Sequence, residues 1–289
     1  RRGLYPEGAG MKKKQIIYSR MQAARLRKLE LADLHRPRST DADVLVSLTS
    51  IPSRFESLDL VVRSVLSQSV APRRMVLWLN ARLQDAVPDS VLALCGGKFE
   101  IRWTEQDSCH CKLAPSLAAF GDQVIVTCDD DLMLRRGWLS SLLDSHTRFP
   151  SEIIAHIARA LTLDADHQVT AYEAWPKQKA RGLAGHQLVQ MGYGGVLYPP
   201  GSLHADATDA ALYMRLTPRA DDLWFKMMAY LAGTAVRTAD RRVGRPREIV
   251  GADEVRLKPS NVNEDGNRAQ WLALCEHYGV TSADLIQRA

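Results

Sequence analysis

Short apolar runs alternate with helical patterns along the first half of the chain. Four runs have the length and composition of buried strands, at residues 43–48, 75–79, 99–103 and 124–128. Between them, apolar positions at helical spacing predict helices over 56–68 and near 87–94. Strands and helices that alternate in this way are typical of a mostly parallel sheet with helices on its faces. The sequence therefore predicts an α/β fold.

The alternation is looser after residue 131. We expect a helix over 137–147, a strand over 153–157, a helix over 221–231 and a last helix near 269–278. No long linker rich in proline or serine separates the two parts of the chain. We therefore expect one composite domain over residues 39–289, with halves at about 39–135 and 136–289.

Residues 1–38 differ in charge from everything that follows. They carry eleven basic and three acidic side chains, a net charge of +8, so the remaining residues carry −3 of the formal total of +5. Between residues 15 and 34, apolar side chains recur at roughly helical spacing among the basic ones: Ile16, Met21, Ala24, Leu31 and Leu34. This pattern predicts a basic amphipathic helix. Either its apolar face packs on the body, or residues 12–38 contact an anionic membrane surface, where each basic residue gains about 1 kcal/mol.

Composition excludes several classes of protein. The chain of 289 residues is 46% hydrophobic and 25% charged, which is a globular balance. It has no apolar run of the roughly 20 residues that a membrane span needs, and no apolar core of a signal peptide. Its five cysteines form an odd set, as expected of free thiols. We expect a cytoplasmic protein, at most peripheral at the inner membrane face, and no nucleic-acid partner, because the body is net negative.

An apolar strand runs directly into three aspartates in the segment VIVTCDDDLML. Ligands gather at the carboxyl ends of strands in open α/β sheets. In extended chain, residues two apart project to the same side, so Asp129 and Asp131 can converge on one hard divalent ion while Asp130 points elsewhere. The alternative is an acidic turn that caps the following helix.

Three other segments are candidates for chemistry. In TPRADDLWFKMMAYL, Asp221 and Asp222 precede a helical run; they favour the helix start, and one of them is a candidate general base. In MGYGGVLYPPG, glycines let the backbone approach a ligand and Tyr193 offers a flat face for a sugar ring, unless it is simply packed. The triplet Cys109, His110 and Cys111 suggests zinc, but its spacing fits no common zinc site.

The chain resembles bacterial glycosyltransferases of the GT-A fold, within the family-2-like group that builds surface polysaccharides. An ordered set of segments over about residues 43–230 carries this resemblance: DVLVSLTSIPSRF, MVLWLN, CKLAPSL, VIVTCDDDLMLRRGWLSSLLDSH, GYGGVLYPP and ADDLWFKMM. It implies a Rossmann-like, mostly parallel central sheet with flanking helices. Residues 39–135 would then be the nucleotide-binding half and residues 136–289 the acceptor half.

The resemblance also implies roles for residues on the donor side. Asp129 and Asp131 match the DxD element, which binds Mn²⁺ or Mg²⁺ together with the nucleotide sugar. The residues expected against the nucleotide, its diphosphate or the donor sugar are Thr49, Ile51, Pro52, Arg54, Asp107, Lys112 and Asp130. A third metal ligand stays open between His204 and His277.

On the acceptor side, Asp222 matches the general base of inverting members of the group. Asp221 and Trp224 would line the acceptor, and we assign Tyr193, Gly194 and Gly195 to substrate binding as well.

The resemblance thus implies an inverting, metal-dependent transfer from a nucleotide sugar, with a UDP-sugar favoured, to a saccharide or lipid-linked saccharide. Two alternatives stay open. The first is a nucleotidyltransferase that acts on sugar phosphates, which normally has a glycine-rich loop after the first strand; SLTSIPSRF has no glycine. The second is a carbohydrate-binding relative without catalytic activity.

Overall fold

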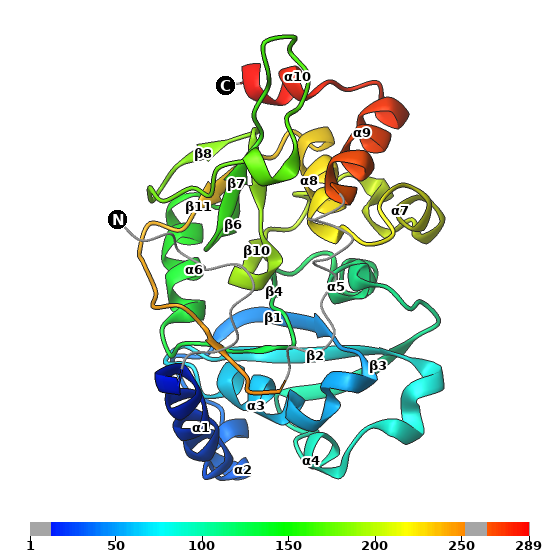
Figure 1. Ribbon diagram of the computed structural model, residues 1–289. Coiled ribbons are helices and arrows are strands. Elements are labelled where there is room, and N and C mark those ends of the chain that lie inside the picture. The colour runs from blue at the N-terminus through cyan, green and yellow to red at the C-terminus, as the bar shows by residue number, and fades with distance from the viewer. Residues whose placement is uncertain (1–12, 252–264, 289) are drawn as a thin grey trace.

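The computed structural model describes residues 13–251 and 265–288, and these form an α/β fold around one mixed sheet (Figure 1). Eight strands lie in the order β3-β2-β1-β4-β10-β6-β11-β8. Their bounds are β3 Phe99–Thr104, β2 Pro72–Asn80, β1 Ala42–Thr49, β4 Ile125–Thr127, β10 Val196–Tyr198, β6 Ile153–Ala155, β11 Val236–Thr238 and β8 Ala184–Gly185. The predicted α/β class is confirmed.

Two strands of this sheet, β10 in the middle and β8 at the edge, run opposite to the other six. Strands β3, β2, β1 and β4 are parallel, but β10 pairs antiparallel with β4 on one side and with β6 on the other. Two small ladders lie outside this sheet: β5 (Leu132–Met133) with β12 (Arg247–Glu248), and β7 (Ala158–Ala160) with β9 (Leu188–Gln190). The sequence did not predict β10, because its three residues follow a glycine-rich stretch that is typical of a loop.

Helices cover both faces of the sheet (Figure 1). One apolar cluster joins the sheet to α1 (Lys13–Arg27), α2 (Leu31–His35), α3 (Phe55–Leu66), α4 (Asp89–Leu92) and α6 (Trp138–Arg148). A second cluster joins it to α5 (Ala114–Phe120), α7 (Ala210–Leu216), α8 (Asp221–Leu231), α9 (Gly266–Tyr278) and α10 (Ser282–Gln287). Side chains alternate between the two faces along each strand: Leu45 lies in the second cluster, and Val46 in the first. No described helix is long and apolar enough to cross a bilayer.

The predicted basic helix forms, but as two pieces. Helix α1 ends at Arg27, and the chain turns before α2. Ser19 and Leu26 are the buried side chains of α1, whereas Met21, one of the apolar positions of the predicted helix, is 62% exposed. Helix α1 packs against α3, and Ser19 donates a hydrogen bond to the carbonyl of Glu248, contacts that apolar spacing alone does not reveal. Residues 1–12 of the basic extension lie outside the described residues.

Helix α8 contains a buried cation in an apolar setting. Lys226 is fully buried, and its Nζ has no hydrogen-bond partner among the described residues. Burial lowers the pKa of Lys226 to about 7. Its charge acts on His186, whose pKa is lowered to about 4 by burial, by Lys226 and by Arg288. An uncompensated amine of this kind destabilises the fold.

We predict that Lys226→Met raises the free energy of unfolding by about 2 kcal/mol at neutral pH. Because the folded-state pKa is lowered, the unfolded chain binds more protons between pH 7 and 10.5, so wild-type stability should rise with pH across that window. The substitution should flatten this slope, as measured by urea unfolding at several pH values. Lys98→Met is the matched control: Lys98 is buried but paired with Asp41, so its loss should destabilise the protein. An unchanged slope in Lys226→Met would contradict the prediction.

Candidate functional site

Polar side chains converge at the edge of the sheet where β1, β2, β3 and β4 end. These four strands are parallel, so their carboxyl ends meet at one edge. Strand β10 runs the opposite way, with Val196 opposite Thr127, so the turn before it reaches the same edge. That turn is the 3-10 segment Gly192–Gly194. The reversal of β10 therefore brings the second half of the chain to the loops of the first half.

Lys112 lies at the centre of this edge, between carboxylates from two distant segments. Its Nζ is 2.7 Å from Asp129 Oδ1 and 3.1 Å from Asp221 Oδ2. Burial alone would lower the pKa of Lys112, but the charges of Asp129, Asp221 and Asp222 outweigh it and hold the pKa well above the ordinary value. The ammonium group is therefore permanently charged. It joins the end of β4 to the start of α8.

Arg54 compensates the other aspartates of the triplet. Its guanidinium pairs with Asp130 and lies 3.3 Å from Asp131 Oδ2. Ser50 donates a hydrogen bond of 2.6 Å to the second oxygen of Asp130. Burial nevertheless raises the pKa of Asp130 against the influence of Arg54 and Ser50. Both oxygens of Asp130 thus have partners within the protein, whereas the side chains of Asp129 and Asp131 each stay about one quarter exposed.

Asp222 faces the same point from the start of α8. Its Oδ1 accepts a hydrogen bond of 2.9 Å from the Gly192 amide. Burial raises the pKa of Asp222 well above the ordinary value, the neighbouring charges of Asp221 and Asp129 raise it further, and Lys112 opposes them. A Cβ atom on Gly192 would lie 2.9 Å from Lys112 Nζ, 3.1 Å from Asp222 Oδ1 and 3.5 Å from Asp129 Oδ1. The absence of a side chain at Gly192 is what lets these three groups approach one another.

Other predicted donor-side residues lie on the loops at this edge. Thr49 ends β1, and its hydroxyl donates to the carbonyl of Trp78 at 2.9 Å. Ile51 and Pro52 follow on the loop that carries Arg54. Asp107 lies after β3 and pairs with Arg82, and both side chains are exposed. The role of these residues at a nucleotide stays a prediction.

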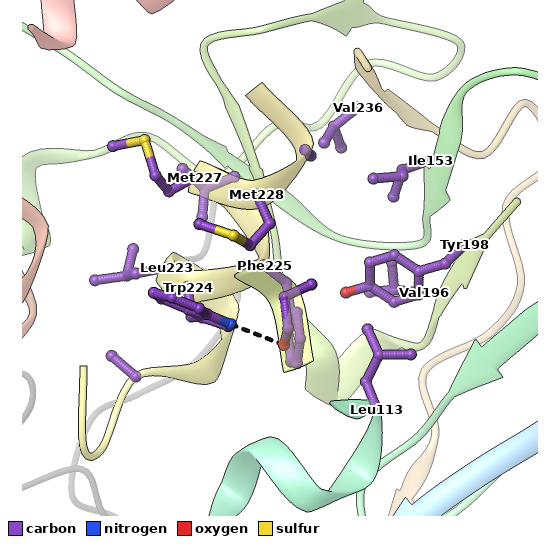
Figure 2. Packing of buried hydrophobic residues seen from close by; sticks show 14 of the residues in the cluster. Leu113, Ile153, Val196, Tyr198, Leu223, Trp224, Phe225, Met227, Met228 and Val236 are labelled. Atoms are coloured by element: carbon purple, nitrogen blue, oxygen red, sulfur yellow. Dashed lines mark hydrogen bonds between the residues drawn. The ribbon is translucent and has the colours of Figure 1, made fainter. Parts of the chain in front are cut away.

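Three acceptor-side assignments need correction or a different explanation. Trp224 does not line the site: it is fully buried on the inner face of α8, and its indole donates to the carbonyl of Ala207 (Figure 2). Packing explains the other two residues, because a Cβ on Gly194 would contact Ile157 and one on Gly195 would meet Trp138 at 2.3 Å. Of the glycines in this turn, Gly192 is the one that faces the carboxylates. Tyr193 is partly buried, and its role stays a prediction.

The triplet at 109–111 serves packing and the positioning of Lys112. His110 is buried and stacks on Tyr213 with ring centroids 4.3 Å apart, and burial lowers its pKa to about 4. Over residues 13–251 and 265–288, no group of three or more His, Cys, Asp and Glu side chains is arranged to hold a metal ion. Neither His204 nor His277 therefore supplies a third ligand beside Asp129 and Asp131 in this structure.

Sequence reasoning missed several groups around Asp222. Gln190 is fully buried, and its amide nitrogen lies 3.3 Å from the backbone oxygen of Asp222. Tyr172 lies near enough for the Asp222 charge to act on it; burial raises its pKa to about 12, with Arg159 opposing and Asp222 reinforcing the shift. Neither residue belongs to a recognisable motif. Ser50 could have been predicted from the sequence, because it lies in the same loop as Arg54.

Comparison with known proteins gives a likeness of fold only. No family model matches the sequence, and no curated protein matches it either. Among solved structures, a 4-diphosphocytidyl-2C-methyl-D-erythritol synthase from Anaerococcus prevotii is 9% identical, covers 82% of this chain and 99% of its own, and has a TM-score of 0.47. An inositol-1-phosphate CTP transferase from T. maritima is 10% identical over 85% of this chain and 100% of its own, with a TM-score of 0.47. A CMP:2-keto-3-deoxy-manno-octonic acid synthetase in complex with CTP is 14% identical over 82% of this chain and 99% of its own, with a TM-score of 0.44.

The two kinds of glycine should respond differently to substitution. We predict that Gly195→Ala lowers the free energy of unfolding by about 2 kcal/mol, because Gly195 has φ of 95° and no room beside Trp138. Gly192→Ala should weaken binding of UDP with Mn²⁺, the ligands expected from the sequence, by roughly tenfold in calorimetry, because its Cβ would displace Lys112 and Asp222. Gly244→Ala is the control, since its Cβ would meet its nearest neighbour at 3.7 Å. Equal effects of the Gly192 and Gly244 substitutions on binding would contradict this prediction.

Proposed function

We propose that the chain transfers a sugar from a nucleotide sugar to an acceptor hydroxyl, with inversion at the anomeric carbon. The observation that carries this proposal is the arrangement around Gly192. A carboxylate with a raised pKa, Asp222, lies beside a permanent cation, Lys112, and a partly exposed carboxylate, Asp129. A base and an anion-stabilising group next to each other suit a reaction that removes a proton from one substrate and releases negative charge on the other.

The donor side of the proposed site suits a divalent ion. Asp129 and Asp131 are two residues apart, partly exposed, and made of the hard oxygen donors that Mg²⁺ and Mn²⁺ prefer. Such ions commonly take one or two carboxylates and complete their shell with water and substrate phosphates, so a pair without a third protein ligand fits. When bound, the ion would neutralise charge on the diphosphate. A UDP-sugar is the donor that we favour.

The residues of the chain itself supply the other steps. Asp222 in its ionised form accepts the proton of the acceptor hydroxyl as that oxygen bonds to the anomeric carbon. The bond from that carbon to the diphosphate oxygen breaks, and the oxygen leaves with the electron pair. Lys112 would stabilise the negative charge that grows on that oxygen. The amide of Gly192 holds Asp222 in position. A saccharide or a lipid-linked saccharide would be the acceptor.

Nucleotidyl transfer to a sugar phosphate is the second candidate. Two cations at this edge, Arg54 and Lys112, would suit a triphosphate, and the three similar structures are named for reactions with CTP or its products. With TM-scores of 0.44 to 0.47, the similarity to these structures concerns the fold and does not extend to their reactions. The loop after β1 contains no glycine from Ser50 to Arg54, whereas a cradle for a triphosphate usually needs close backbone approach. A base such as Asp222 is also better used on a neutral hydroxyl than on a phosphate that is already ionised.

The product released by the protein separates these candidates. With Mn²⁺ and a panel of UDP-sugars we expect release of UDP, and Asp222→Asn should lower that rate by about 10²–10⁴-fold while leaving binding of the UDP-sugar nearly intact. Asp144→Asn, an exposed carboxylate on α6, is the control. Release of pyrophosphate from nucleoside triphosphate and sugar phosphate would instead establish the second candidate. Binding without any product would mean that the chain is a carbohydrate-binding relative without activity.

The raised pKa of Asp222 predicts a particular pH dependence. Because only the ionised carboxylate accepts a proton, the rate should fall as pH drops through its pKa, at a pH well above the ordinary Asp value of 3.8. Asp221→Asn removes the neighbouring charge that raises this pKa and frees Lys112 to act on Asp222, so the acidic limb should move to lower pH. Asp85→Asn, on the surface, should leave the limb in place. Movement to higher pH in Asp221→Asn would contradict this assignment.

A further inference from the structure

Helix α1 presents an apolar stripe to solvent. Ile17, Tyr18 and Met21 are 57%, 53% and 62% exposed, and their spacing of three and four residues places them on one face of the helix. The opposite face, with Ser19 and Leu26, is buried against the body. A helix packed on a protein normally turns its polar side outward. Here the outward side carries three large hydrophobic residues in its middle.

Cations surround this stripe, and the segment that carries them contains no acidic residue. Six basic residues lie between residues 13 and 28, and the first acidic residue after them is Glu30. They are Lys13, Lys14, Arg20, Arg25, Arg27 and Lys28. Arg27 reaches Asp59 on α3 at 3.1 Å, which leaves the others directed to the exterior face or its rims. The outward face of α1 therefore combines exposed apolar side chains with positive charge.

The helix is held in place independently of any partner. Ser19 donates a hydrogen bond of 2.8 Å to the carbonyl of Glu248, and Arg63 donates one of 2.9 Å to the carbonyl of Leu29. The guanidinium of Arg247 lies 5.2 Å from the ring of Tyr18. Figure 1 shows α1 at the outside of the molecule, next to α3. Its outward face is therefore already ordered and needs no folding step to bind.

We propose that the outward face of α1 docks the protein on an anionic lipid bilayer. Ile17, Tyr18 and Met21 would enter the boundary between headgroups and acyl chains, and the basic residues would pair with lipid phosphates. A second copy of the chain is a poor occupant, because a symmetric contact would place two sets of cations against each other. A nucleic acid would meet the cations but leave the apolar stripe without an apolar partner. The inference is independent of the reaction at Asp222.

Vesicle sedimentation of the full chain tests this docking. We expect binding to vesicles of phosphatidylcholine mixed with phosphatidylglycerol, weakened by salt, and little binding to phosphatidylcholine alone. Ile17→Ser combined with Met21→Ser, and Lys14→Gln combined with Arg25→Gln, should each lower the partition coefficient by roughly tenfold. Met214→Ser combined with Leu272→Ser is the matched control, since these residues are similarly exposed hydrophobics elsewhere.

Three outcomes would overturn the proposal. The first is equal binding to both kinds of vesicle, and the second is unchanged binding of the Ile17 and Met21 variant. The third is a wild-type dimer in sedimentation velocity that the variant does not form, without any lipid binding. Melting temperatures equal to wild type establish that the variants fold. UDP release from a soluble donor should be unaffected by the substitutions on α1. The vesicle result therefore tests the docking face independently of the proposed reaction.

Discussion

Carboxylates from two distant segments crowd one edge of the sheet, and the fold at that edge depends on how their charge is compensated. Asp129–Asp131 follow β4, and Asp221 and Asp222 begin α8. Without nearby cations, these carboxylates would repel one another and the two segments would separate. Lys112 joins the two groups, and Arg54 holds the remaining aspartates. Each cation comes from a loop that follows a strand, so the charge balance also fixes the position of those loops.

Helix α8 connects the apolar core to this edge. Its apolar side chains, including Trp224, Phe225 and Met228, are buried in one cluster, which fixes the helix along its length (Figure 2). Asp221 and Asp222 lie in its first turn, where the helix dipole favours negative charge. A rigid helix with an acidic first turn can hold a carboxylate in a partly dehydrated place. The raised pKa of Asp222 is a consequence of that position.

Sequence pattern revealed the elements whose burial is uniform. Strands β1 to β4 and helices α3 and α8 lie where apolar periodicity places them, and α8 begins at Asp221 as expected. The approach of Asp129 to Asp222 was expected only from the family resemblance, because spacing along a chain carries no information about contacts between remote segments. Trp224 was assigned to the acceptor side but is fully buried, and Met21, one of the apolar positions of the predicted helix, is exposed. Periodicity identifies an apolar face, but not whether a given large side chain enters the core, faces a ligand or faces the exterior.

The reversed strand β10 has a consequence for the independence of the two halves. It lies between β4 of the first half and β6 of the second, and it pairs with both. A cut near residue 135 would leave β4 with an open edge and remove Gly192 from Lys112 and Asp129. The halves thus share one sheet and one set of charges. Evolution or engineering could exchange loops around this edge, but neither half is a transferable module.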